Sequence, residues 1–124
     1  MTTAPTSRSA SRYVFIGIRV LLTLAFVAAG LAKLAGVQMM VDTFTAVGVG
    51  QWFRYITGII EIGSAILLWV PGMQAIGAGL LICTMIGATI AHLTVLNSPP
   101  VPAIILGVLA AITLWANKDQ LARR

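Results

Sequence analysis

Four stretches of the chain are almost continuously apolar, and short polar or turn-forming segments separate them. The stretches cover residues 13–37, 52–70, 73–96 and 101–115. Each is near the ~20 residues that a helix needs to cross the hydrocarbon core, and the last is the shortest. Pro71-Gly72 and Asn97-Ser98-Pro99-Pro100 interrupt helices between the later stretches. The pattern predicts an all-α integral membrane bundle, with four transmembrane helices running up-down-up-down in a single domain over residues 13–117.

The segment between the first two apolar stretches, residues 38–51, is too polar to span a membrane. Its apolar residues Met40, Phe44 and Val47 fall on one face of a helix, and polar residues occupy the other faces. We therefore expect a short amphipathic helix that lies at the membrane interface and ends near Gly48.

Composition supports a membrane protein, because 59% of the residues are hydrophobic and only 9% are charged. Soluble domains carry about 25% charged residues. The net charge is +5, but the basic residues gather at the chain ends rather than in a stripe that would bind nucleic acid. We expect residues 1–12 and 118–124 to be basic cytoplasmic tails, the first of them disordered. Arg19, inside the first apolar stretch, argues against a cleaved signal peptide.

The sequence carries no metal or covalent-cofactor signature, since it has one cysteine, Cys83, and one histidine. A single cysteine forms no disulfide within the chain. Small residues recur at every fourth position around it, at positions 75, 79, 83, 87 and 91. Such a ridge lets helices approach closely, so it predicts packing, and a homo-oligomer, through the third apolar stretch.

Glu61 is the most informative polar residue, because it lies in the middle of the second apolar stretch. A charged side chain at the centre of a membrane helix costs about 2.5–3.5 kcal/mol, so it normally faces a protein interior. Arg54 and Thr57 share its helix face, and Arg19 and Lys33 share one face of the first stretch. We expect these two polar faces to turn toward each other, away from lipid.

The partner of Glu61 stays open at this point. A rise of 1.5 Å per residue places Arg19 about 8 Å from Glu61 in depth, within reach of an arginine side chain, and favours it as the counter-ion. Lys33, Arg54 and His92 lie on the other side of Glu61, toward the outer face. Glu61 and His92 are the candidate catalytic residues, whereas Arg19, Lys33, Arg54 and Thr57 are candidate ligand-binding residues.

The order of these features resembles the DoxX family of small bacterial membrane proteins. The resemblance rests on Arg19, Ala28–Leu34 (AAGLAKL), Phe44 with Gly48, Gly58–Gly63 (GIIEIG) and Gly87–His92 (GATIAH). Where family members often carry Gly-x-Pro, this chain has Gly48-Val49-Gly50, so its entry into the second apolar stretch departs from the family pattern.

The resemblance implies a four-helix bundle in a bacterial membrane and an association with quinone-linked redox complexes. The basic residues at the chain ends, with an even number of spans, favour cytoplasmic termini in the inner membrane. Three functions follow as hypotheses. The first is a membrane subunit that binds a quinone-like lipid at the Glu/His/Lys/Arg cluster, with electrons supplied by a redox partner protein. The second is a stand-alone membrane enzyme that uses Glu61 for acid–base chemistry on a small hydrophobic substrate. The third is a structural or transport module in which Glu61 and Arg19 form a structural ion pair.

Overall fold

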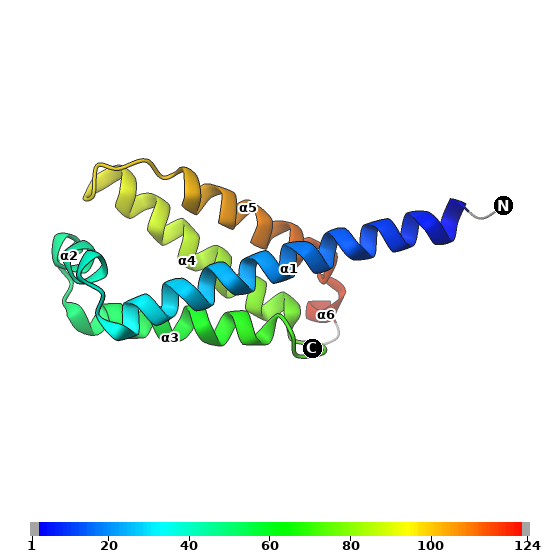
Figure 1. Cartoon of the computed structure of the whole chain (residues 1–124), viewed down its shortest axis with the longest axis horizontal. Coiled ribbons are helices and arrows are strands. Elements are labelled where there is room, and N and C mark those ends of the chain that lie inside the picture. The colour runs from blue at the N-terminus through cyan, green and yellow to red at the C-terminus, as the bar shows by residue number, and fades with distance from the viewer. Residues whose placement is uncertain (1–2, 123–124) are drawn as a thin grey trace.

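The chain folds entirely into helices, as its sequence predicts. A computed structural model describes the backbone of residues 3–122 and the side chains of residues 10–122. The helices are α1 (Thr3–Ala35), α2 (Gln38–Val47), α3 (Gln51–Leu67), α4 (Gln74–Thr94), α5 (Val101–Ala116) and α6 (Asp119–Ala122). Figure 1 shows α1, α3, α4 and α5 running in alternating directions, with α2 at one end of the bundle and both chain termini toward the other.

Helix ends lie where the sequence places its strongest breakers. Gly48 ends α2 with a left-handed φ of 83°, and its N–H donates to the carbonyl of Phe44. Pro100 directly precedes α5, which begins at Val101. The interruption at Pro71-Gly72 separates α3 from α4. Local turn chemistry therefore determines these boundaries, because each breaker acts within a few residues of itself.

Helix α1 begins within the first predicted tail, and α6 lies within the second. Helix α1 begins at Thr3, so residues 3–12 are helical where the sequence predicted a disordered tail. A helix that has already nucleated extends at the cost of ordering one residue for each new hydrogen bond. At the other end, the Gln120 Oε1 atom accepts a hydrogen bond from the N–H of Ala75, which ties α6 to the start of α4. Residues 1–2 and 123–124 of the predicted tails lie outside the described residues.

Two of the helices are long and apolar enough to cross a membrane: residues 10–35 of α1, and α4. Helix α5 is a shorter apolar helix of 16 residues, and α3 has 17 residues. A full crossing takes about 20 residues, with a range from about 17.

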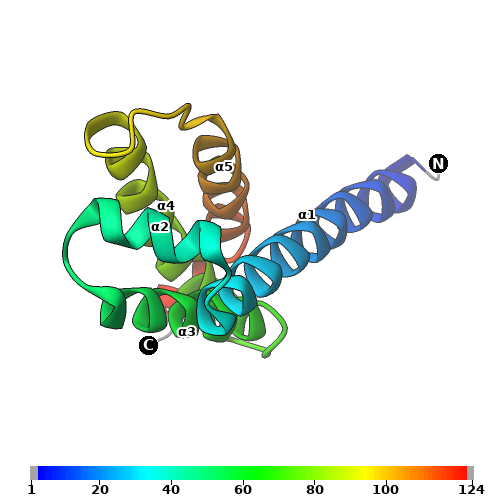
Figure 2. The same cartoon turned by 60° about the vertical axis from the view of Figure 1, so that its left-hand side comes forward.

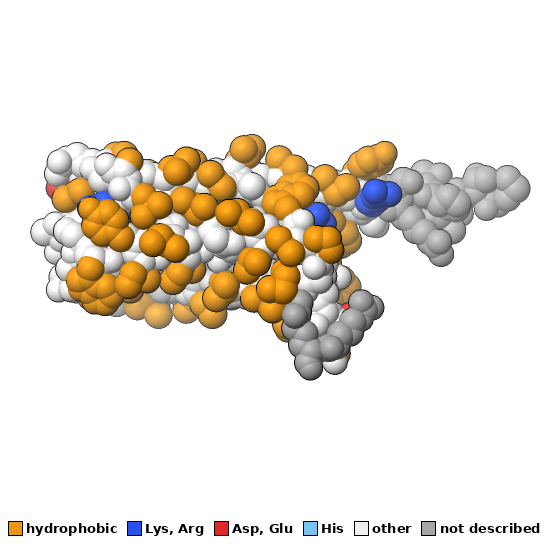
Figure 3. Space-filling view, turned by 90° about the horizontal axis from the view of Figure 1, so that it is seen from below, with side chains coloured by type: hydrophobic (Ala, Val, Ile, Leu, Met, Phe, Trp, Pro, Cys, Tyr) orange, Lys and Arg blue, Asp and Glu red, His pale blue; other side chains and the backbone are white. Residues whose placement is uncertain are grey.

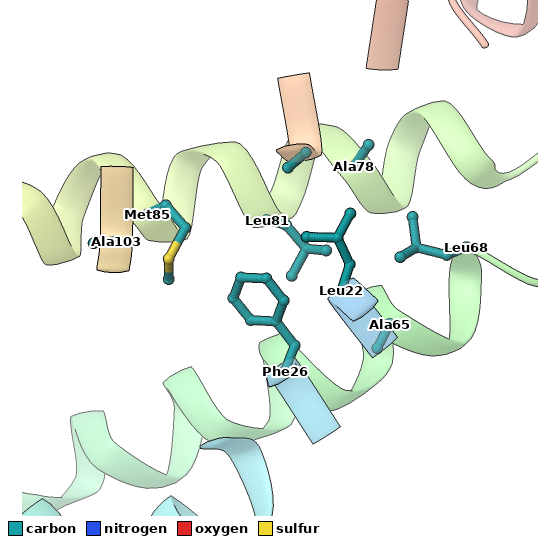
Figure 4. Packing of buried hydrophobic residues seen from close by; sticks show 9 residues of the cluster. Leu22, Phe26, Ala65, Leu68, Ala78, Leu81, Met85 and Ala103 are labelled. Carbon is teal, nitrogen blue, oxygen red and sulfur yellow. The ribbon is translucent and has the colours of Figure 1, made fainter. Parts of the chain in front are cut away.

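Apolar side chains from four helices form the core of the bundle. Leu22 and Phe26 of α1 point toward Leu81 of α4, and Ala65 of α3 and Leu68, the residue after α3, lie beside them (Figure 4). Ala103 and Ala110 of α5 complete the cluster together with Ala78 and Met85 of α4. Small residues at the points of contact let the helix backbones approach closely.

Large apolar side chains cover the outside of the same bundle. Hydrophobic side chains spread along the face seen in Figure 3, while Lys and Arg side chains lie toward its two ends. Leu24, Ile59 and Ile90 are each more than half exposed. Soluble monomers rarely expose an apolar surface of this extent. The apolar surface therefore fits contact with the lipid bilayer.

A close helix crossing lies between α1 and α3. A methyl group added at Gly30 would lie 2.8 Å from the carbonyl oxygen of Gly58 and 2.5 Å from the Ile62 Cγ1 atom. A methyl group at Gly58 would lie 3.1 Å from the Lys33 Cβ atom. Only glycine leaves room for this approach, which brings the polar end of α1 against the middle of α3.

Candidate ligand-binding site

A cavity of about 570 Å³ lies where α3 and α4 separate. These two helices pack together near the turn that joins them and diverge toward the end of the bundle that carries α2 (Figure 1). Figure 2, with that end turned forward, shows α2 lying across it between its connections to α1 and α3. Residues of α1, α2, α3 and α4 line the space, together with Leu96 after α4, so elements far apart in the sequence border the cavity.

Most of the cavity wall is apolar. Helix α2 contributes its apolar face, and the edge of the Phe44 ring packs against Phe53 of α3, with ring centroids 5.9 Å apart. The other apolar and small lining residues are Met39, Met40, Val47, Ile60, Cys83, Met85, Gly87, Ala88, Ala91 and Leu96. Ligand pockets typically have volumes of about 300–1,000 Å³, apolar walls and a few placed polar groups. This cavity meets that description in size and lining.

Lys33 and Glu61 form an ion pair at the cavity, with the Lys33 Nζ atom 2.7 Å from the Glu61 Oε1 atom. The exposed fraction of the side chain is 13% for Lys33 and 2% for Glu61. The Gly30–Gly58 crossing places the two residues side by side, because it brings the last turns of α1 against α3. Removing one partner of a pair buried to this extent strongly destabilises the folded protein, because the other charge stays buried alone.

His92 reaches the same cavity from the last turn of α4. Its Nδ1 atom lies 2.6 Å from the Ser98 hydroxyl, in the segment before α5, and the Ser98 N–H donates to the His92 carbonyl. The hydroxyl contact orients the imidazole ring, and the backbone bond holds Ser98 beside it. When Ser98 donates its hydroxyl proton to Nδ1, the Nε2 atom carries the ring proton and can donate to a bound group.

Three threonine side chains add polar atoms to the wall: Thr43, Thr57 and Thr84. Each hydroxyl already donates to the backbone carbonyl four residues earlier, at distances of 2.8 to 2.9 Å. Their remaining capacity is to accept hydrogen bonds, since the single proton of each hydroxyl is in use. The cavity therefore presents one ion pair, one imidazole and several weak acceptors to a ligand.

Arg54 lies beside this site but does not line the cavity. Its guanidinium donates to the carbonyl of Lys33 in the last turn of α1 and, through Nε at 2.8 Å, to the Gln51 side chain. It also lies over the Tyr55 ring, 4.3 Å from the ring centroid. A cation that caps the carbonyl end of a helix stabilises it. The contacts of Arg54 thus join α3 to the end of α1, and ligand binding by Arg54 stays a prediction.

The favoured ion pair between Arg19 and Glu61 is wrong, because Glu61 pairs with Lys33. Arg19 lies over the Trp69 ring at 5.0 Å from its centroid, and the Trp69 indole donates to Thr23, one turn further along α1. Trp69 is eight residues beyond Glu61, which corresponds to about 12 Å along a helix. The antiparallel register of α1 and α3 therefore sets Arg19 apart from the cavity.

Comparison with protein families gives a match over residues 17–116. The chain belongs to the DoxX-like family. The match extends from α1 to the end of α5 and includes every element that lines the cavity, so the family resemblance is confirmed. Comparison with curated proteins and with solved structures gave no match. Family and apolar helices together mark this DoxX-like protein as a membrane protein.

Four of the site residues predicted from the sequence line the cavity of this DoxX-like protein: Lys33, Thr57, Glu61 and His92. The sequence prediction missed the wall formed by α2, although the apolar face that includes Phe44 was recognised. In the structure that face lines the cavity, and the place of α2 at the membrane interface stays a prediction. A signal was present, since two adjacent methionines and a phenylalanine on a short helix also suit a ligand surface.

The ridge of small residues at every fourth position of α4 is partly buried in the bundle and partly exposed at the cavity. Ala75 is buried, whereas Cys83 and Gly87 are exposed and line the cavity. The buried face of α4 instead contains Gly77, Ala78 and Leu81, together with Ala75 and Met85. Packing within this chain thus uses a different face, and association of DoxX-like protomers through the ridge stays a prediction.

Proposed function

We propose that this DoxX-like protein is a membrane subunit of a redox complex, and that it binds a quinone-like lipid in the cavity between α2, α3 and α4. The observation that carries the proposal is the Lys33–Glu61 ion pair at an otherwise mostly apolar cavity of about 570 Å³. An intramembrane ion pair that borders open space supports a binding role, because a purely structural pair needs no adjoining cavity.

The lining suits a molecule with a polar ring and an apolar tail. Carbonyl oxygens accept hydrogen bonds, and the Lys33 ammonium of α1 and the His92 ring N–H of α4 are donors at the cavity wall. Apolar residues of α2 and α4, such as Met40 and Ala88, would contact the rest of the ring and the tail. Glu61 keeps Lys33 in place and can hold a proton at its carboxyl oxygens.

A bound quinone would supply the redox chemistry, taking up two electrons from a partner protein and two protons for each reduction. Within this chain, Glu61 and His92 are the groups at the cavity that can exchange protons. The Ser98 contact keeps the imidazole oriented while it does so.

The proposal includes a membrane arrangement. All four long helices would span the bilayer, and α2 would lie at the outer interface. Both chain ends lie at the end of the bundle opposite α2 (Figure 1). Arg12 and Lys118 lie toward these ends, and Arg123 and Arg124 follow in the sequence, so the charge distribution favours cytoplasmic termini in the inner membrane.

A second candidate function uses the same cavity. A carboxylate paired with an ammonium, together with an imidazole on the facing helix, is also suited to general acid–base catalysis on a small hydrophobic substrate. The two candidates differ in their requirement for a partner. Purified protein would convert the substrate by itself in the second case, and would only bind a quinone in the first.

Cys83 offers a direct test, because it is the single cysteine of the chain and lines the cavity. The probe is a short-tailed benzoquinone with a fully substituted ring, because such a ring does not react with thiols by addition. Its binding should slow the modification of Cys83 by a maleimide several-fold. The rate is measured by intact-mass spectrometry on the full-length protein in mild detergent. Decanol at the same concentration should give little protection, because it lacks the ring carbonyls.

A matched control moves the thiol to the outside of the bundle. Val108 of α5 is 54% exposed and does not line the cavity, so the quinone should leave the thiol of the Cys83→Ala, Val108→Cys variant unprotected. Equal labelling rates of Cys83 with and without saturating quinone would refute binding at this cavity.

A further inference from the structure

A second hollow, of about 340 Å³, lies at the opposite end of the bundle from α2. It is a groove between α1 and the end of α5, lined by Arg12, Phe15, Ile16, Arg19, Ala116 and Asn117. We call it the basic groove. It shares no residue with the cavity between α2, α3 and α4.

Among the described side chains, no carboxylate pairs with the two arginines of the basic groove. The chain has three carboxylate side chains, at Asp42, Glu61 and Asp119, and none of them lines the groove. In the part of the chain whose side chains are described, the ion pair found is Lys33–Glu61 at the other end. Two guanidinium groups, spaced seven residues apart on α1, therefore leave a net positive charge in a concave site.

Aromatic side chains place this groove at the depth of lipid headgroups. Tyr13 is 71% exposed and follows Arg12, and Trp115 is 65% exposed and precedes the groove residue Ala116. Trp69, which lies under the Arg19 guanidinium, is 46% exposed. Exposed tyrosine and tryptophan gather at the membrane–water interface. An anion at the groove would thus meet the arginines at the level where phospholipids carry their phosphate.

We propose that the basic groove binds the phosphate of an anionic phospholipid, with Arg12 and Arg19 as the ligating residues. Arginine presents paired N–H donors that match phosphate oxygens. Phe15 and Ile16 on the same wall would contact the start of the acyl chains. The carbonyl end of α5 adds a partial negative charge of about half a unit, which the two full positive charges outweigh. Basic pockets between membrane helices bind anionic headgroups in this manner.

The test is native mass spectrometry of the full-length protein in mild detergent, titrated with phosphatidylglycerol and, separately, with phosphatidylcholine. Wild-type protein should retain phosphatidylglycerol preferentially. Arg12→Gln and Arg19→Gln should each weaken its binding about fivefold, and the double variant on the order of 20-fold. Lys118→Gln is the matched control, because Lys118 is exposed at the same end but lies over Trp115 outside the groove. It should weaken binding less than either arginine variant.

A further variant tests the groove without removing an arginine, so that the proposal stays testable if the arginine variants misfold. Ala116→Trp fills the groove at an exposed position without removing charge, and it should also reduce lipid retention. Millimolar inorganic phosphate that displaces the lipid completely would identify free phosphate, rather than a lipid, as the ligand of the groove. Equal retention of both lipids by wild-type protein, or unchanged retention of phosphatidylglycerol by the double variant and by Ala116→Trp, would overturn the proposal.

Discussion

Replacing Lys33 with methionine is expected to destabilise the folded protein by about 3–5 kcal/mol. The substitution keeps the length of the side chain but removes the cation that lies 2.7 Å from Glu61, whose side chain is 2% exposed. The Glu61 carboxylate is then buried without a counter-ion. The free-energy cost of that unpaired charge exceeds the net stabilisation that the ion pair contributes. Unfolding by titration with sodium dodecyl sulfate in mixed micelles measures the change in the free energy of unfolding.

A double variant distinguishes the interaction between the two charges from the effect of removing each charge alone. Lys33→Met with Glu61→Leu removes both charges and should recover most of the stability lost in Lys33→Met, because apolar residues often replace a buried ion pair at little cost. Lys118→Met, at an exposed lysine on the far end of the bundle, should leave the unfolding free energy unchanged within error. Additive losses in the double variant would show that the two charges do not interact.

Replacing Gly30 with leucine is expected to force α1 away from α3 and to cost about 3 kcal/mol, at the upper end of the range for overpacking. Even the first carbon of the new side chain would lie 2.8 Å from the backbone oxygen of Gly58, which cannot move without its helix. Separation at this crossing would also move Lys33 away from Glu61. Protection of Cys83 by a quinone should therefore fall together with stability.

The same substitution elsewhere on α1 provides the control. Gly17 is exposed, and a Cβ atom there would meet no other atom within 4 Å. Gly17→Leu should leave both the free energy of unfolding and the protection of Cys83 close to wild type. A Gly30→Leu protein as stable as the Gly17→Leu protein would show that the α1–α3 crossing tolerates a wider separation than the structure indicates.

The helices could be predicted from the sequence because their signals are local. Continuous apolar stretches, Gly48 and the Pro99-Pro100 pair each act on neighbouring residues, and the bounds of α2 and α5 follow from them. The expectation that the polar faces of the first two apolar stretches meet was also correct, since Lys33 and Glu61 form an ion pair.

The identity of the partner was less predictable, because periodicity fixes a helix face but not the register between two helices. The depth estimate compared distances along each helix separately and took no account of where the two helices cross. The Gly30–Gly58 contact sets the actual register and brings Lys33, rather than Arg19, to Glu61. The cavity itself depends on the divergence of α3 and α4, which no local pattern encodes.

The measurement that tests the central proposal most directly is native mass spectrometry of the full-length protein, purified in mild detergent and examined for a retained ligand. Wild-type protein should carry a mass in the range of a quinone or a similar amphipathic molecule, and Glu61→Gln should lose it. Asp42→Asn is the matched control, since it makes the same chemical change at an exposed carboxylate outside the cavity, and it should keep the ligand. Equal retention in all three proteins, or no ligand in any of them with Glu61→Gln only less stable, would contradict a binding role for Glu61 and favour a structural ion pair.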